Sequence, residues 1–269
     1  MIFFPNCKIN LGLNIIRRRP DGFHDLETVF YPLPLRDIIE AVPSDQFNFT
    51  GSGLPLPGNQ ENNLCIRAYQ LLKKRFPSLP PVHFFLHKNI PAGAGLGGGS
   101  ADAACTLRML NQQFDLDLSG QELMQYAREL GSDCPFFILN KPCFGSGRGD
   151  VLEPIELNLS KYVFVLVHPG IHMDTALAFS GITPTLPARP IREILRAPLP
   201  AWRSALINDF EAPAIRKYPE LVTIRDTLYA SGAVYASMTG SGSSFYGIFE
   251  KQSVPSIRFE QNFRVDILK

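Results

Sequence analysis

Hydrophobic and polar residues alternate most regularly near the beginning of the chain. In residues 8–16 every second side chain from Ile9 to Ile15 is aliphatic, and the residues between are polar or glycine. This period of two is typical of a strand with one buried face. The turn residues Pro20-Asp-Gly follow and predict a hairpin with a second strand at 24–31. Further strands are expected at 37–42 and 47–50.

Helical periodicity begins after this β-rich quarter. Residues 63–76 place their leucines on one stripe, which predicts an amphipathic helix. Ser119 and Glu122 have the spacing of a capping box that opens another helix, which Gly131 is expected to end. Strands and helices are mixed without regular alternation, which favours an α+β fold. The other expected elements are strands at 82–87, 162–168 and 245–249 and helices at about 99–113, 201–217 and 219–231.

Length and composition limit the classes of protein that fit. A chain of 269 residues suits one large domain or two modest ones. The polar, glycine-rich stretch 145–150 predicts a boundary between a domain at 1–150 and a second at 151–269. A net charge of +1 gives no basic field for nucleic acid, and no apolar run is long enough to cross a membrane.

The cysteines and the first residues predict a cytoplasmic protein. The five cysteines are an odd number without a CxxC pair, so we expect reduced and mostly buried thiols. The start of the chain lacks the basic region and the cleavage site of a secretory signal. His83 and His87 have a spacing that could bind zinc on a helix. Their segment is expected to be a strand, where this spacing is too long, so a zinc site is disfavoured.

Glycines dominate the segment Pro91-Ala-Gly-Ala-Gly-Leu-Gly-Gly-Gly-Ser100, which leads into an expected helix. Glycine lets a ligand approach the backbone, and a helix N-terminus presents unpaired N–H groups, so the segment predicts a phosphate site. Five residues separate the preceding strand from its GxGxxG pattern, which disfavours a dinucleotide-binding fold. A Walker loop is excluded because no Gly-Lys-Ser/Thr follows. Ser100 is either a phosphate or Mg²⁺ ligand or a simple helix N-cap.

Three further features gain meaning only in combination. The cluster Gly240-Ser-Gly-Ser-Ser244 suggests a second backbone wall for the same anion pocket. Lys8 and Asn10 share the polar face of the first strand, where a solvated lysine is the ordinary expectation. Asp133 is either a helix N-cap before Pro135 or a general base beside a lysine.

The ordered set of motifs resembles the GHMP kinases, a superfamily of small-molecule kinases. The resemblance rests on Lys8-Ile-Asn-Leu, on the glycine segment 91–101 and on Met238-Thr-Gly-Ser-Gly-Ser-Ser. Within the superfamily the chain is similar to the kinases of 4-diphosphocytidyl-2-C-methylerythritol, which serve the non-mevalonate isoprenoid route. This narrower resemblance rests on Pro20-Asp-Gly-Phe-His24, Glu61-Asn-Asn-Leu64, Leu130-Gly-Ser-Asp-Cys-Pro135 and His168-Pro-Gly170.

The resemblance implies a two-domain fold with its active site in the cleft between domains, and transfer of the ATP γ-phosphoryl group to the substrate's 2-hydroxyl. It implies ATP and Mg²⁺ as cofactors and Lys8 and Asp133 as the catalytic pair, with Asp133 as the base. Phe23 and Phe179 are expected to sandwich the cytosine, and His24 to read its edge. The implied ATP-binding residues are Asn63, Lys88, Pro91, Gly93, Gly95, Leu96, Gly97, Gly98, Gly99 and Ser100. The implied substrate-binding residues are Asn10, Phe23, His24, Thr175, Phe179, Gly240 and Ser241.

Two departures and two alternatives accompany the resemblance. Ala101 stands where many of these loops have a second serine, which weakens any detailed assignment of Mg²⁺ ligands. Phe23 replaces a common tyrosine, so stacking is kept while a hydroxyl contact is lost. The alternatives are a GHMP kinase of mevalonate or homoserine, and a sensor that binds nucleotide without transferring phosphate.

Overall fold

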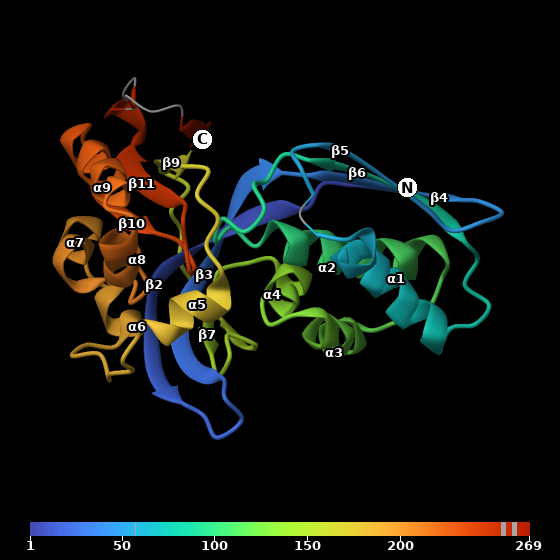
Figure 1. Cartoon of the computed structure of the whole chain (residues 1–269). Helices are drawn as coiled ribbons and strands as arrows, with labels where there is room; N and C mark the ends of the chain where they lie inside the picture. The colour runs from blue at the N-terminus through green and yellow to red at the C-terminus, as the bar shows by residue number, and fades with distance from the viewer. Residues whose placement is uncertain (57, 254–256, 260–262) are drawn as a thin grey trace. The chain divides into compact units, whose positions relative to one another are not determined.

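The structure is a computed structural model that describes residues 1–56, 58–253, 257–259 and 263–269 (Figure 1). The chain divides into two compact units, each assembled from separate segments and each with a hydrophobic core. The first unit comprises Met1–Lys8, Pro32–Ala92 and Gly97–Lys141. The second unit comprises Ile9–Tyr31, Gly93–Leu96 and Pro142–Lys269.

The first unit is a sheet with helices on one face (Figure 1). Its strand order is β1-β4-β6-β5, with β5 parallel to β6 and the other pairs antiparallel. The strands are β1 (Ile2–Phe3), β4 (Ile38–Pro43), β5 (Asn48–Gly53) and β6 (Val82–Lys88). The helices are η1 (Gln60–Asn62), α1 (Leu64–Arg75), α2 (Gly98–Gln113), α3 (Gly120–Leu130) and α4 (Cys134–Leu139).

Sequence patterns account for this unit well. Alternate residues of β6 are buried, beginning with Val82 and ending with Lys88. Helix α3 begins with the predicted capping box of Ser119 and Glu122, and Gly131 is its C-cap. Helices α1 and α2 contact each other, and their apolar side chains share a core with β4 and β6.

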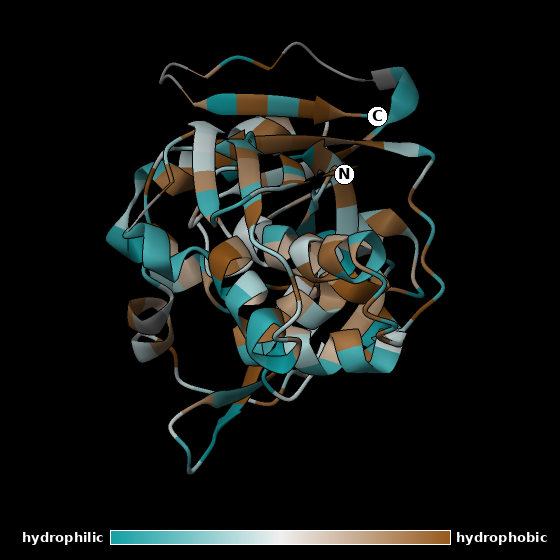
Figure 2. Ribbon diagram, turned by 90° about the vertical axis from the view of Figure 1, so that its right-hand side faces the viewer, coloured by the Kyte–Doolittle hydropathy of each residue, from teal (hydrophilic) through white to brown (hydrophobic). Residues whose placement is uncertain are grey.

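The second unit contains an antiparallel sheet of order β10-β11-β9-β12. Helix α9 packs against β10 and β11, and apolar residues of these elements form the core. Figure 2 shows polar and apolar residues alternating along β12, the strand beside the C-terminus. The strands are β9 (Tyr162–His168), β10 (Tyr235–Met238), β11 (Phe245–Glu250) and β12 (Arg264–Leu268). The helices are α5 (Thr175–Ser180), α6 (Ile191–Ile194), η2 (Leu199–Ala201), α7 (Trp202–Ala205), α8 (Glu211–Lys217), α9 (Glu220–Ala230) and η3 (Lys251–Ser253).

A third sheet has the order β2-β3-β7-β8. Its first two strands have 13 residues each and are longer than the sequence predicted. Each continues from one unit into the other, since the units divide after Lys8 and after Tyr31. The strands are β2 (Asn6–Arg18), β3 (His24–Arg36), β7 (Cys143–Ser146) and β8 (Val151–Pro154). The α+β class is confirmed, and a domain boundary at 150 stays a prediction.

One predicted helix is wrong. The continuous helix expected at 201–217 is divided into α7 and α8. The chain between them is held extended against β2, because Leu13 N donates to Ile207 O (2.9 Å) and Asp209 N donates to Leu13 O (2.8 Å). These hydrogen bonds join residues almost 200 positions apart, so helical periodicity could not reveal them.

The predicted burial of the cysteines and the predicted strand at His83 and His87 agree with the structure. All five cysteines are free and buried. His83 and His87 lie on β6 and bond to the hydroxyls of Thr50 (2.9 Å) and Ser52 (3.0 Å) on β5. Among the described residues, no group of three or more His, Cys, Asp or Glu side chains could hold a metal ion. No helix in the described ranges is long and apolar enough to cross a membrane.

Candidate active site

The predicted catalytic pair is in contact within the first unit. Lys8 Nζ on β2 lies 3.3 Å from Asp133 Oδ2, and the Lys8 side chain is 3% exposed whereas that of Asp133 is 34% exposed. Asp133 occupies the N-cap position of α4, yet its side chain makes no capping hydrogen bond. The carboxylate is therefore paired with an ammonium and remains accessible, as a general base requires.

The end of the glycine segment lies against this pair. Gly97 is the N-cap of α2 and has a φ of +71°. A Cβ at this position would lie 3.1 Å from Lys8 Cε and 2.9 Å from the ring of Phe137. Position 97 therefore needs glycine for two reasons: its backbone is left-handed, and the Lys8 side chain lies close to where a Cβ would be.

Ser100 lies in the first turn of α2, three residues after the N-cap Gly97. The alternative that Ser100 is the N-cap is therefore wrong. Its side chain lies close enough to the thiol of Cys134, the residue directly after Asp133, to lower the pKa of that thiol against the larger, opposing effect of burial. The free N–H groups of the first turn of α2 and the Ser100 hydroxyl consequently lie close to the Lys8–Asp133 pair.

In the second unit the two glycine motifs are in direct contact. A Cβ at Gly95 would lie 2.0 Å from Thr239 O, and the φ of Gly95 is +78°. Thr239 Oγ1 donates to Gly95 O (3.2 Å), and Ser244 N donates to Ala94 O (3.3 Å). Only glycine fits at position 95, because the second motif occupies the space of a side chain.

Three of the predicted substrate-binding residues lie at or beside the second glycine motif, residues 238–244. Thr175 Oγ1 on α5 and Ser241 Oγ lie 3.2 Å apart. Asn10 N donates to Thr239 Oγ1 (3.0 Å), while Asn10 Nδ2 donates to Thr28 Oγ1 (2.9 Å). The Asn10 amide is buried and already hydrogen-bonded, so its predicted contact with substrate stays a prediction.

Aromatic rings expected to bind the base are arranged in two groups in the second unit. His24 stacks on Phe179 with centroids 4.9 Å apart and an interplanar angle of 15°. Phe23 is 51% exposed, and the guanidinium carbon of Arg148 lies 4.1 Å from its ring centroid. One face of Phe23 is thus covered by a cation, and no motif in the sequence pointed to Arg148.

A pocket of about 450 Å³ lies in the first unit beside Asn63. The Asn63 side chain caps α1 by accepting from Cys65 N (2.9 Å). Asn63, a predicted ATP-binding residue, therefore lines a cavity. The lining residues are Phe49, Gly51, Ser52, Gly53, Leu54, Pro55, Leu56, Gly58, Asn59, Gln60 and Asn63.

Lys88 forms a buried ion network instead of facing this pocket. Its ammonium pairs with Asp37 and lies 2.7 Å from Asp102 Oδ2, and all three side chains are almost completely buried. Burial raises the pKa of Asp102 to about 7, opposed by Lys88 and reinforced by Asp37. The Lys88 ammonium is thus paired within the core of the first unit, and the binding of ATP by Lys88 stays a prediction.

The network instead holds the segments around the predicted nucleotide site. Asp37 Oδ1 accepts from Asn89 N (2.6 Å) and Ile90 N (2.8 Å), just before the glycine segment. Lys88 O accepts from Leu54 N (2.8 Å) in the pocket wall. Of the remaining predicted ATP-binding residues, Pro91 and Leu96 are buried, whereas Gly93 and Gly99 are exposed.

Comparisons with known proteins agree with this arrangement. Residues 63–141 match the GHMP kinases N terminal domain, and residues 192–260 match the GHMP kinases C terminal family. The 4-diphosphocytidyl-2-C-methyl-D-erythritol kinase of Bacteroides fragilis is 48% identical over 98% of this chain and 97% of its own length. That of Parabacteroides distasonis is 49% identical over 93% and 92%. The chain belongs to the 4-diphosphocytidyl-2-C-methyl-D-erythritol kinase family.

Solved structures place this family member among the GHMP folds. A crystal structure of 4-(cytidine 5'-diphospho)-2C-methyl-D-erythritol kinase is 32% identical, covers 100% of this chain and 99% of its own, and has a TM-score of 0.83. The mevalonate kinase of Methanococcus jannaschii shares the fold at 13% identity, with a TM-score of 0.71 and coverage of 99% and 97%. The present protein is therefore an ATP-dependent kinase of a small molecule.

We expect the stability of this kinase to depend on pH because of His168, which lies beside the second glycine motif. His168 Nδ1 lies 3.1 Å from Ser244 Oγ. Burial lowers the pKa of His168, and Arg264 adds to this effect. The unfolded chain binds a proton near pH 6.5, above the folded pKa, so the free energy of unfolding should fall as the pH falls from about 7 to about 5. Urea denaturation at both pH values should show a smaller fall in the free energy of unfolding for His168→Gln than for the wild type. The control His87→Gln, on the exposed face of β6, should show the same fall as the wild type. Equal falls in all three proteins would refute the assignment to His168.

Proposed function

We propose that this kinase transfers the γ-phosphoryl group of ATP to the 2-hydroxyl of 4-diphosphocytidyl-2-C-methyl-D-erythritol. The observation that carries the proposal is the accessible Asp133 carboxylate, 3.3 Å from the buried Lys8 ammonium and beside the start of α2. The similarity to the Bacteroides fragilis and Parabacteroides distasonis kinases of this substrate supports it. The reaction would serve the non-mevalonate route to isoprenoid precursors in the cytoplasm.

In this proposal Asp133 and Lys8 have different roles in the reaction of the acceptor hydroxyl. Asp133 accepts the proton of the 2-hydroxyl as the oxygen attacks phosphorus. Lys8 holds the carboxylate in place and offsets negative charge as the phosphoryl group approaches. Such transfers need mainly positioning and charge stabilisation from the protein, which matches a site with one base and one fixed cation.

The nucleotide has a binding element for each of its ends. The N–H groups in the first turn of α2, a helix of 16 residues, suit the phosphates, because the positive end of the helix dipole lies there. The pocket beside Asn63 has the size and the mixed lining that a purine base requires. The Asp37–Lys88–Asp102 network supports both elements from inside the first unit.

The residues at the start of α2 also fit Mg²⁺. This ion commonly takes one or two protein oxygens and completes its shell with phosphate oxygens and water, so a single hydroxyl is sufficient. Ser100, in the first turn of α2, would supply that hydroxyl. When bound, the ion would neutralise charge on the phosphates.

The acceptor specificity separates this proposal from a mevalonate or homoserine kinase. Phe23 with Arg148 and His24 with Phe179 provide flat surfaces for a base, which neither small acyclic substrate contains. Purified protein should therefore phosphorylate the cytidylyl substrate in preference to mevalonate and homoserine. Turnover of only the two acyclic substrates would overturn the proposal.

Removing the cation from Phe23 should weaken binding of the cytidylyl substrate. Arg148→Ala leaves the exposed ring without its guanidinium neighbour, and a cation–π contact contributes roughly 0.5–2 kcal/mol. We expect the KM for this substrate to rise about three- to tenfold, with the KM for ATP unchanged. Arg203→Ala is the matched control, because Arg203 lies 4.0 Å from the ring of Tyr229, which is not a predicted substrate residue. Equal KM values for the two variants in steady-state assays would contradict the role of Arg148.

A further inference from the structure

The second glycine motif depends on other parts of the second unit for its shape. Its glycines Gly240 and Gly242 have φ values of +57° and +94° and no side chains with which to anchor themselves. A glycine-rich backbone can adopt many conformations, so fixing it in one of them costs entropy. Hydrogen bonds from other parts of the chain are needed to offset this cost. The buried side chain of Asn208, before α8, and the partly buried side chain of Glu211, at its start, supply such bonds.

Asn208 holds the carbonyl groups of the motif. Its Nδ2 donates to Met238 O and to Gly240 O, each at 2.9 Å, and its Oδ1 accepts from Phe210 N (3.0 Å). The side chain is 2% exposed, so these bonds form without competition from water. The extended segment that contains Asn208 is itself fixed to β2 through Leu13.

Glu211 binds the backbone N–H of Met238, whose carbonyl group is bound by Asn208. Glu211 Oε2 accepts from Met238 N (2.9 Å) and from Ser237 Oγ (3.1 Å). Its other oxygen, Oε1, pairs with Nη1 of Arg225 on α9 at 3.1 Å. Met238, the last residue of β10, therefore has its N–H fixed by Glu211 and its carbonyl fixed by Asn208.

We propose that Asn208 and Glu211 are positioning residues that set the second glycine motif for substrate binding. The inference rests on the proposed function and on the prediction from the sequence that Gly240 and Ser241 bind the acceptor substrate. Thr239 extends the effect further, because its carbonyl faces Gly95 and its hydroxyl bonds to Gly95 O. A displacement of the Met238–Gly240 backbone would move both contacts together.

The test replaces the amide donor without changing its size. Asn208→Asp cannot donate to two carbonyl groups, so both bonds to the motif are lost and the new charge repels the carbonyl oxygens. Because a misplacement of about 1 Å can reduce a rate by about 100-fold, we expect kcat/KM for the acceptor to fall about tenfold to 100-fold. Nucleotide affinity should change less than this, since the base pocket and α2 belong to the first unit and only Gly95 of the predicted ATP-binding residues contacts Thr239.

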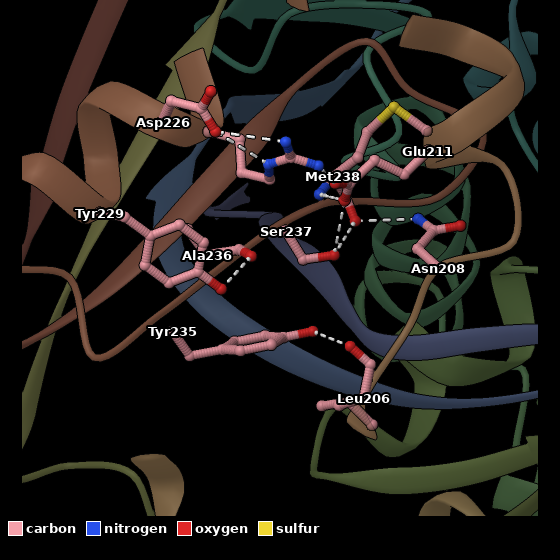
Figure 3. A network of polar contacts seen from close by, with 10 residues as sticks. Leu206, Asn208, Glu211, Asp226, Tyr229, Tyr235, Ala236, Ser237 and Met238 are labelled. Carbon is pink, nitrogen blue, oxygen red and sulfur yellow. Dashed lines mark hydrogen bonds and ion pairs between the residues drawn. The ribbon is translucent and has the colours of Figure 1, made fainter. Parts of the chain in front are cut away.

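Tyr235→Phe is the matched control. It removes another buried bond of the same network, from Tyr235 Oη to Leu206 O (2.9 Å), which does not touch the motif (Figure 3). A merely structural role for Asn208 would lower the melting temperature of both variants and leave kcat/KM of the folded protein unchanged. That result would overturn the proposal.

Glu211 provides an independent test should Asn208→Asp fail to fold. Glu211→Gln keeps an oxygen that can accept from Met238 N, whereas Glu211→Ala does not. We expect Gln to retain most of the acceptor kcat/KM and Ala to lose about tenfold; equal losses would overturn the proposal. All variants are compared on whichever acceptor the wild type phosphorylates best, so an error in the proposed substrate remains distinguishable from an error in the positioning role.

Discussion

Asp133→Asn should reduce phosphoryl transfer by roughly 10²- to 10⁴-fold, the usual contribution of a positioned general base. Asparagine has the shape of aspartate and can still bond to Lys8, but it does not accept the proton of the acceptor hydroxyl. The affinities for ATP and for the acceptor should change little. Single-turnover kinetics and calorimetric binding to the same protein samples measure the two quantities separately.

One control variant and two possible outcomes decide this experiment. Asp45→Asn, at an exposed position in the first unit, controls for the loss of one negative charge. Unchanged transfer in Asp133→Asn would remove Asp133 from the base role. If the wild-type chain binds both ligands and transfers nothing, the non-catalytic sensor becomes the correct interpretation.

Lys88→Met should lower the free energy of unfolding by about 3–5 kcal/mol, the cost of leaving a buried charge without its partner. Asp37 and Asp102 would then face each other in the core of the first unit without a cation. The opening of the glycine segment should loosen as well, because Asp37 fixes Asn89 and Ile90. Urea denaturation followed by circular dichroism measures the loss.

Two variants test the electrostatic reason for that loss. Lys74→Met, on the exposed part of α1, should leave the free energy of unfolding within about 0.5 kcal/mol of the wild type. Adding Asp102→Asn to Lys88→Met should restore part of the stability, since one of the two uncompensated carboxylates is removed. If the double variant is no more stable than Lys88→Met, lost packing of the lysine stem is the better explanation.

Local pattern predicted much of both units. The period-two alternation around Ile9, the capping box at Ser119 and the stripe of α1 each follow from contacts within a few residues, and the structure contains all three elements. The contact between Lys8 and Asp133 was anticipated through resemblance to a family, because no spacing rule joins residues so far apart in the chain.

Long-range contacts explain what the sequence did not predict. Lys88 looks like a surface lysine until Asp37 and Asp102 are brought to it from two other elements. Asn208 and Glu211 resemble ordinary residues at a helix start, and their bonds to Met238 depend on a strand nearly thirty residues later. Pairing across such separations is set by tertiary packing and leaves no trace in local periodicity.

The interleaving of the two units has a consequence for how such a protein can be divided. Each unit draws on three stretches of chain, and the glycine segment itself passes from one unit to the other and back within residues 92–97. No single break in the polypeptide releases either unit whole. A gene fragment ending at residue 150 would encode Ile9–Tyr31 and Gly93–Leu96 without the sheet on which their unit is built. The kinase is therefore expected to be inherited, recombined and engineered as one piece, unlike proteins whose domains follow each other along the gene.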